Sequence, residues 1–99
     1  MKVTIKGKEY GVKNSLRAVL IFEESRGKAF SISTVTDLIT YQYCMICAGG
    51  SDDVPSFNDF LDELDANPKL AEDLNAYFHA EQKRNEIFND ESKKKRANR

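Results

Sequence analysis

Residues 33–50 read STVTDLITYQYCMICAGG, and this stretch predicts the central helix of the fold. Thr34 precedes Asp37 by three residues, which is the spacing of a capping box, with Asp in place of the usual Glu. The apolar side chains that follow fall on two helical faces, so little of the helix should face solvent. Gly49 and Gly50 then end it. We therefore predict a largely buried helix over residues 34–48.

Two elements are expected before the central helix. Residues 2–13 alternate apolar and polar side chains around a turn at Gly7-Lys8, which predicts a β-hairpin. Its apolar face should consist of Val3, Ile5, Tyr10 and Val12. A first helix is expected over residues 15–26, and its apolar side chains should be well buried. These are Leu16, Val19, Leu20 and Phe22.

The tripeptide Arg26-Gly27-Lys28 follows the first predicted helix and has two readings, a phosphate-binding site or a helix end. A P-loop has Ser or Thr directly after its lysine, whereas this chain has Ala29. Glycine is common just past a helix, where the backbone turns left-handed, and a cation there faces the negative end of the helix dipole. We therefore predict that the tripeptide ends the helix.

Two further helices are expected after the central one. Ser56 to Asp59 repeats the capping pattern, and an amphipathic stripe follows at helical spacing, which predicts a helix over residues 57–66. Asn67-Pro68 breaks this helix and starts another over residues 68–90. The predicted fold is thus a single α+β domain over residues 1–91, an N-terminal β-hairpin packed on a bundle of about four helices. Residues 92–99, SKKKRANR, should form a flexible basic tail.

Charge is distributed unevenly along the 99 residues. The net charge is +4 over residues 1–28, −10 over residues 29–91 and +5 over residues 92–99. An acidic helical body argues against specific nucleic-acid binding, where cations gather on a structured face, and it suits a basic or helical protein partner. No apolar run approaches the roughly 20 residues that span a bilayer, so no membrane contact is expected. The N-terminus does not read as a signal peptide, which predicts a cytoplasmic protein.

Few residues of the sequence suggest catalysis, redox activity or metal binding. Cys44 and Cys47 have the C-x-x-C spacing of a redox pair or of half a zinc site, but they lie inside a predicted helix and His79 is the only other candidate ligand of that kind. Core packing of reduced thiols is therefore the expected role. His79 has no nucleophile indicated beside it. We predict no enzyme activity, no cofactor and no metal.

The acidic region supplies the candidate partner-binding surface. Residues 51–76 contain eight Asp or Glu and one cation, Lys69, around two aromatic residues. Such a region is either a solvated surface over a core stripe or a recognition surface, with apolar anchors inside a negative rim. The end of the last helix offers further apolar positions. The candidate partner-binding residues are Phe57, Asp59, Phe60, Asp62, Glu63, Tyr77, Ile87 and Phe88.

The order of these segments resembles that of the tail assembly chaperones of long-tailed phages and prophages. A hairpin carrying GKEY leads into a helix that ends in FEESRGK, residues 22–28. The central helix, closed by two glycines, comes next. The acidic helix FNDFLDEL, residues 57–64, precedes NPKL, residues 67–70, and a last helix. The resemblance covers about residues 1–90.

The resemblance implies a non-enzymatic role in the host cell cytoplasm. Members of this family bind the helical tape measure protein before the tail tube polymerises around it, and they are absent from the finished virion. The tail tube protein is a further candidate partner. Many members are also made in a longer form by ribosomal frameshifting, and Lys93-Lys94-Lys95 would permit an A-rich slippery run of codons. Since so short a chain buries only a modest core, self-association would stabilise it.

Two alternatives belong to other classes. A small DNA-binding regulator would use two short helices and the basic tail, but the predicted helix after Ser33 presents almost no Lys, Arg, Asn or Gln. A thiol or metal protein would depend on Cys44 and Cys47, and full burial of both thiols would argue against it.

Overall fold

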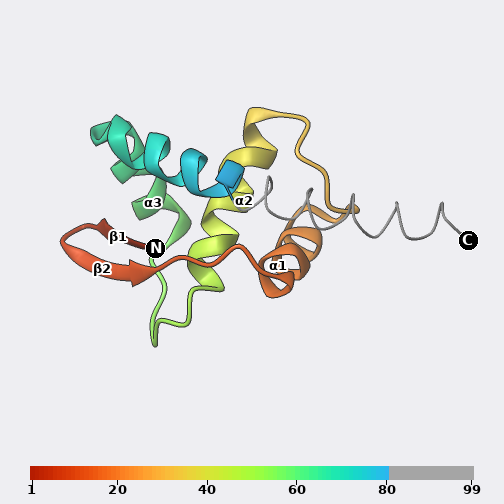
Figure 1. Cartoon of the computed structure of the whole chain (residues 1–99), viewed down its shortest axis with the longest axis horizontal. Helices are drawn as coiled ribbons and strands as arrows, with labels where there is room; N and C mark the ends of the chain where they lie inside the picture. Colours follow the sequence, from red (N-terminus) through yellow and green to blue (C-terminus); the bar gives the residue numbers. More distant parts are fainter. Residues whose placement is uncertain (81–99) are drawn as a thin grey trace, which may run out of the picture.

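The computed structural model describes residues 1–80 and confirms the α+β class (Figure 1). The chain forms an antiparallel hairpin and then helices, in the order β1 (Lys2–Ile5), β2 (Lys8–Gly11), α1 (Leu16–Arg26), α2 (Val35–Cys47) and α3 (Phe57–Ala66). A fourth helix starts at residue 68 and continues through residue 80. The predicted remainder of that helix and the predicted tail over 92–99 lie outside the described residues. No helix within residues 1–80 is both long enough and apolar enough to cross a bilayer.

The hairpin has the predicted apolar face. Val3 pairs with Tyr10 across the two strands, and both side chains are buried, as are those of Ile5 and Val12. The turn lies one residue earlier than predicted, at Lys6-Gly7, where both residues have positive φ angles of 52° and 77°. Two positive φ angles are typical of the type I′ turn, whose twist matches that of the flanking strands.

Helix α1 has the expected ends but a different buried face. The Ser15 side chain caps its N-terminus, and Gly27 ends it in the left-handed conformation with φ 66°, so the predicted helix end is confirmed. Its buried residues are Ala18 and Phe22. Leu16 and Leu20 are 73% and 56% exposed, so the prediction that they are well buried is wrong. Among the described helices and strands, α1 makes substantial contacts only with α2. A single neighbouring helix covers only one face of α1, so the opposite face stays exposed.

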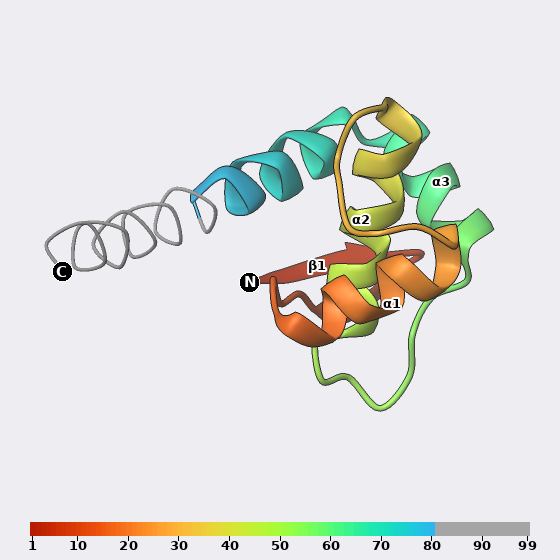
Figure 2. The same ribbon diagram turned by 90° about the vertical axis from the view of Figure 1, so that its right-hand side faces the viewer.

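Helix α2 is the central element, as predicted. It passes through the middle of the body, with α1 on one side and α3 and the fourth helix on the other (Figures 1 and 2). The predicted capping box between Thr34 and Asp37 is present. Six of its 13 residues are buried, whereas its first residue, Val35, is 76% exposed. Its fully buried residues are Asp37, Tyr41, Gln42, Cys44, Met45 and Ile46.

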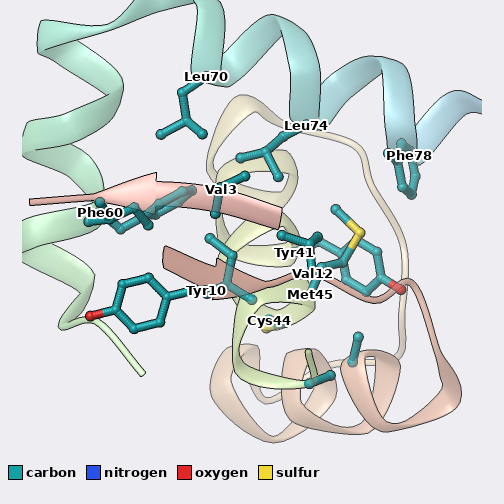
Figure 3. Close-up of a cluster of buried hydrophobic side chains, with 14 of the residues drawn as sticks. Val3, Tyr10, Val12, Tyr41, Cys44, Met45, Phe60, Leu70, Leu74 and Phe78 are labelled. Carbon is teal, nitrogen blue, oxygen red and sulfur yellow. The ribbon is translucent and has the colours of Figure 1, made fainter. Parts of the chain in front are cut away.

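One core connects the elements. Figure 3 shows side chains of the hairpin, α2, α3 and the fourth helix converging in it. Phe22, Phe30, Tyr41 and Phe78 form an aromatic chain through this core, with successive ring centroids 4.9–5.6 Å apart. Edge-to-face and tilted arrangements at such distances are the favoured geometries for aromatic pairs. The chain thereby connects Phe22 with Phe78, which are 56 positions apart in the sequence.

The hairpin is fastened to residues that come much later in the chain. The Lys13 N–H donates to the Met45 carbonyl at 3.0 Å, and the Gly11 N–H donates to the Ser51 hydroxyl at 2.9 Å. At the other end of the hairpin, the Lys6 N–H donates to Glu63 Oε1 at 2.8 Å. These bonds satisfy backbone groups at the end of α2 and at the hairpin turn.

Candidate partner-binding groove

An apolar groove runs between α2 and α3. Its volume is about 260 Å³, and it is open to solvent. A second hollow of about 380 Å³ continues it toward the end of α1, because the two share Thr36, Thr40 and Phe57. We call the first hollow the α2–α3 groove. It is lined by Val35, Thr36, Ile39, Thr40, Phe57 and Leu61.

Helix caps place the two apolar walls of the groove. Thr34 caps α2, so Val35 is its first residue and Ile39 follows one turn later on the same face. Ser56 caps α3 in the same way, so Phe57 comes first and Leu61 follows one turn later. Each helix therefore contributes an i, i+4 pair of apolar side chains. Val35 and Phe57 remain 76% and 39% exposed.

The position of Phe57 is fixed by Tyr43 of α2. Their ring centroids lie 5.2 Å apart with the planes at 78°, an edge-to-face pair. The Tyr43 hydroxyl donates to the Pro55 carbonyl at 2.6 Å, just before α3 begins. Burial raises the pKa of Tyr43 to about 12, so the hydroxyl keeps its proton at neutral pH. The aromatic wall of the groove is thus held in place before any ligand binds.

The predicted anchors Phe57 and Phe60 have different roles. Phe57 lines the groove, whereas Phe60 is fully buried under the hairpin side of α3. A fully buried side chain cannot contact a partner, so the prediction that Phe60 is a partner anchor is wrong. Both residues belong to one amphipathic stripe, but only Phe60 is buried in the core, whereas Phe57 is 39% exposed.

Two acidic residues of the predicted rim contact another residue of the same chain. Glu63 accepts the Lys6 N–H, and Asp62 lies 3.6 Å from Lys6 Nζ in an exposed ion pair. Glu63 therefore helps to position the hairpin turn, and its assignment to the partner surface stays a prediction. Asp59 is exposed, and Asp65 is exposed one turn after Leu61. Helix α3 contains four acidic residues and no cation, so one wall of the groove belongs to an acidic helix.

The remaining predicted surface residues lie elsewhere. Tyr77 is half-buried on the fourth helix, and its hydroxyl accepts the Asn14 N–H at 3.4 Å. It therefore helps to join the fourth helix to the segment before α1 and does not line the groove. Ile87 and Phe88 lie outside the described residues.

Asp37 is a buried junction that the sequence analysis predicted only as a cap. Its carboxylate accepts hydrogen bonds from Arg26 Nε at 3.2 Å and from Lys28 Nζ at 2.9 Å, in addition to the Ser33 and Thr34 N–H groups. Hydrogen bonds from Lys28 and then Ser33 hold the pKa of the Asp37 carboxyl well below its ordinary value, against the opposing effect of burial. Both cations of Arg26-Gly27-Lys28 thus contact this carboxylate.

The two cysteines are packed in α2. Cys44 is 1% exposed and Cys47 is half-buried, and both are free thiols. Burial, together with the charge of Cys47, raises the pKa of Cys44 to about 12, and burial also raises the pKa of Cys47. Within residues 1–80, no group of three or more His, Cys, Asp or Glu could hold a metal ion. His79 is exposed on the fourth helix.

The groove combines two apolar ridges with an acidic helix, an arrangement that suits an amphipathic helical ligand. The sequence of α2, VTDLITYQYCMIC, carries no Lys or Arg to present to DNA phosphates. We find that no family model matches the chain, and searches of curated proteins and of solved structures give no significant match.

Proposed function

We propose that this protein is a tail assembly chaperone of long-tailed phages and prophages. It binds the helical tape measure protein in the α2–α3 groove and keeps it soluble in the host cell cytoplasm until the tail tube forms. One observation carries the proposal: an open apolar groove between two helices, with Val35 and Phe57 exposed on opposite walls. The order of the hairpin, the helix ending in FEESRGK and the acidic helix adds the resemblance to this family.

The shape of the groove favours one helical ridge as its ligand. Val35 and Ile39 on α2 face Phe57 and Leu61 on α3 across the groove. An amphipathic helix places apolar side chains at i, i+3, i+4 and i+7, which form a ridge that can lie between two such walls. A long tape measure helix exposes repeated ridges of this kind before assembly, and uncovered ridges aggregate.

The negative charge of α3 and its neighbours favours a particular kind of helical ligand. Asp65 is exposed on α3 one turn after the groove residue Leu61, and the segment from residue 29 to residue 91 has a net charge of −10. A ligand helix with Lys or Arg beside its apolar ridge is therefore favoured, and its association should become slower as salt screens the attraction.

The groove also suits a temporary complex. Its volume of about 260 Å³ is small, and it is open to solvent. Complexes with small, exposed interfaces are usually weak. Low affinity appears mainly as a fast dissociation rate, so such complexes separate readily. Tail tube subunits could then displace the chaperone as they polymerise, and the finished virion would not contain it.

The experiment is co-expression of this chain with the tape measure protein from the same genome. We expect the tape measure protein to become soluble and to co-elute with the chaperone on size exclusion. Phe57→Asp should abolish both effects, because it places a charge in the apolar wall. Val54→Asp is the matched control, since Val54 is similarly exposed at 43% but does not line the groove.

Two results would contradict the proposal. A tape measure protein that precipitates equally with and without this chain would remove the chaperone function. Equal rescue by the wild type and by a correctly folded Phe57→Asp variant would remove the groove as the binding site. Circular dichroism and thermal melting of each variant show whether it is folded.

A further inference from the structure

Helix α1 carries an apolar stripe that the fold leaves uncovered. Leu16 and Leu20 lie one turn apart on the same face and are 73% and 56% exposed. The opposite face, with Ala18 and Phe22, packs into the core. Among the described residues, the stripe is not part of the α2–α3 groove, whose lining comes from α2 and α3 alone. Figure 2 shows α1 in front of α2, on the outer side of the body.

Opposite charges lie at the two ends of this stripe. Arg17 and Glu24 are both exposed and two turns apart, so they lie on the same side of α1. Within residues 1–80, neither side chain takes part in an ion pair. A further cation, Lys13, borders an open hollow of about 590 Å³ together with Leu16 and Arg17. The start of α1 is therefore positive and its exposed end carries a carboxylate.

We propose that the protein forms a symmetric dimer in which α1 packs antiparallel against α1 of a second copy. In a two-fold arrangement the same patch on each copy must complement itself, so residue i contacts residue j and j contacts i. With the axis beside Leu20, the two Leu20 side chains meet and Leu16 of each copy lies over the second half of the other α1. Arg17 of each copy then faces Glu24 of the other.

The charge pattern favours a second copy over another partner. A stripe that carries one cation and one carboxylate at opposite ends is complementary to its own inverted image. A ligand with charges of a single sign would gain at one end and lose at the other. Antiparallel packing also sets the N-terminus of one α1 beside the C-terminus of its neighbour, so the two helix dipoles attract. The hollow beside Lys13 gives the acidic end of the second copy space to approach.

The expected dimer is weak and depends on concentration. The stripe is confined to an 11-residue helix, so the buried area should fall below the roughly 800 Å² per partner of standard stable interfaces. We therefore expect monomer and dimer to exchange over the range of protein concentrations used for sedimentation. The groove residues do not contribute to this interface, and dimerisation does not depend on the proposed chaperone function.

Sedimentation velocity of the full chain over a concentration series tests the proposal. We expect the weight-average sedimentation coefficient of the wild type to rise with concentration toward the dimer value, and Leu20→Glu to remain monomeric. Val54→Glu is the matched control and should behave as the wild type, because Val54 lies outside α1. A wild type that stays monomeric up to about 1 mM, or a dimer that Leu20→Glu leaves intact, would overturn the proposal.

Charge exchange tests the antiparallel geometry. Arg17→Glu and Glu24→Arg should each raise the dimer dissociation constant about tenfold, because like charges then face each other. The double variant restores opposite charges at both contacts and should return the constant to near that of the wild type. A double variant that dimerises as poorly as the single variants would overturn the antiparallel pairing.

Discussion

Gly11 and Gly49 touch backbone to backbone, so neither position has room for a side chain. A Cβ atom on Gly49 would lie 2.0 Å from the Gly11 carbonyl oxygen, and one on Gly11 would lie 2.5 Å from the Gly49 carbonyl oxygen. Real Cβ atoms do not approach backbone atoms so closely. The contact brings the end of β2 against the end of α2, where the Lys13 N–H reaches the Met45 carbonyl.

Gly49→Ala is therefore expected to separate the hairpin from α2 and to lower the melting temperature strongly. Gly7→Ala is the comparison, because a Cβ at Gly7 meets no atom within 4 Å but the residue has φ 77°. That variant should lose only about 1 kcal/mol through backbone strain. Thermal melting by circular dichroism measures both. Equal losses in the two variants would show that the close contact is not what limits position 49.

Removing the Asp37 charge should destabilise the protein in a pH-dependent way. In Asp37→Asn, Arg26 and Lys28 lose their buried partner, and we expect the melting temperature at pH 7 to fall by on the order of 10 °C. The folded-state pKa of Asp37 lies below the ordinary value of 3.8. The carboxylate therefore stabilises the fold fully above about pH 4, and this contribution declines as the pH falls toward the folded-state value.

The measurement is the difference in melting temperature between the wild type and Asp37→Asn from pH 7 down to pH 2. It should narrow below about pH 4, since other carboxyl groups titrate equally in both proteins. A difference that stays constant across this range would mean that the charge of Asp37 contributes nothing and that only its shape matters.

The two aromatic residues of α3 should respond differently to truncation. Phe60→Ala removes a fully buried ring and should lower the free energy of unfolding by about 3–5 kcal/mol. Phe57→Ala removes an exposed ring whose main loss is the edge-to-face pair with Tyr43, about 1 kcal/mol. Urea denaturation measures both values. If Phe57→Ala proved as costly as Phe60→Ala, Phe57 would be a core residue and the groove would have a different wall.

The thiols should be unreactive in the folded protein. Because burial raises the pKa of Cys44 to about 12, almost no thiolate is present at pH 8, and a disulfide reagent should label Cys44 only in denaturant. The half-buried Cys47 should react more slowly than a free cysteine. Mass spectrometry of labelled protein assigns each site. Rapid labelling of both thiols without denaturant would restore the thiol-protein alternative.

The sequence predicted the bounds of the helices and strands better than it predicted which of their faces are buried. Helix starts are local features, so Thr34 and Ser56 could be recognised as caps from neighbouring residues. Exposure depends on which face another element covers, and the spacing of Leu16 and Leu20 carries no information about that. The same limit applies to Phe57 and Phe60, which lie on one stripe but at the edge and at the centre of the packing, respectively.

The contacts of Asp37 with Arg26 and Lys28 could not be predicted from the sequence, although the three residues stand out there. Arg26 and Lys28 flank the helix-ending glycine, and Asp37 lies in the first turn of the next helix. Only the path of the intervening loop turns both cations back onto the carboxylate. The groove could not be predicted from the sequence for the same reason, because it requires Val35 and Phe57, 22 positions apart, to face each other.

The hairpin bonds have a consequence for synthesis of the chain on the ribosome. The first residues to be made are held by residues made much later, because the Gly11 N–H donates to Ser51 and the Lys6 N–H donates to Glu63. A nascent chain therefore carries an unsupported hairpin, with its apolar face open, until α3 has emerged. Release of the chain before residue 63 would leave that face uncovered for as long as the fragment survives.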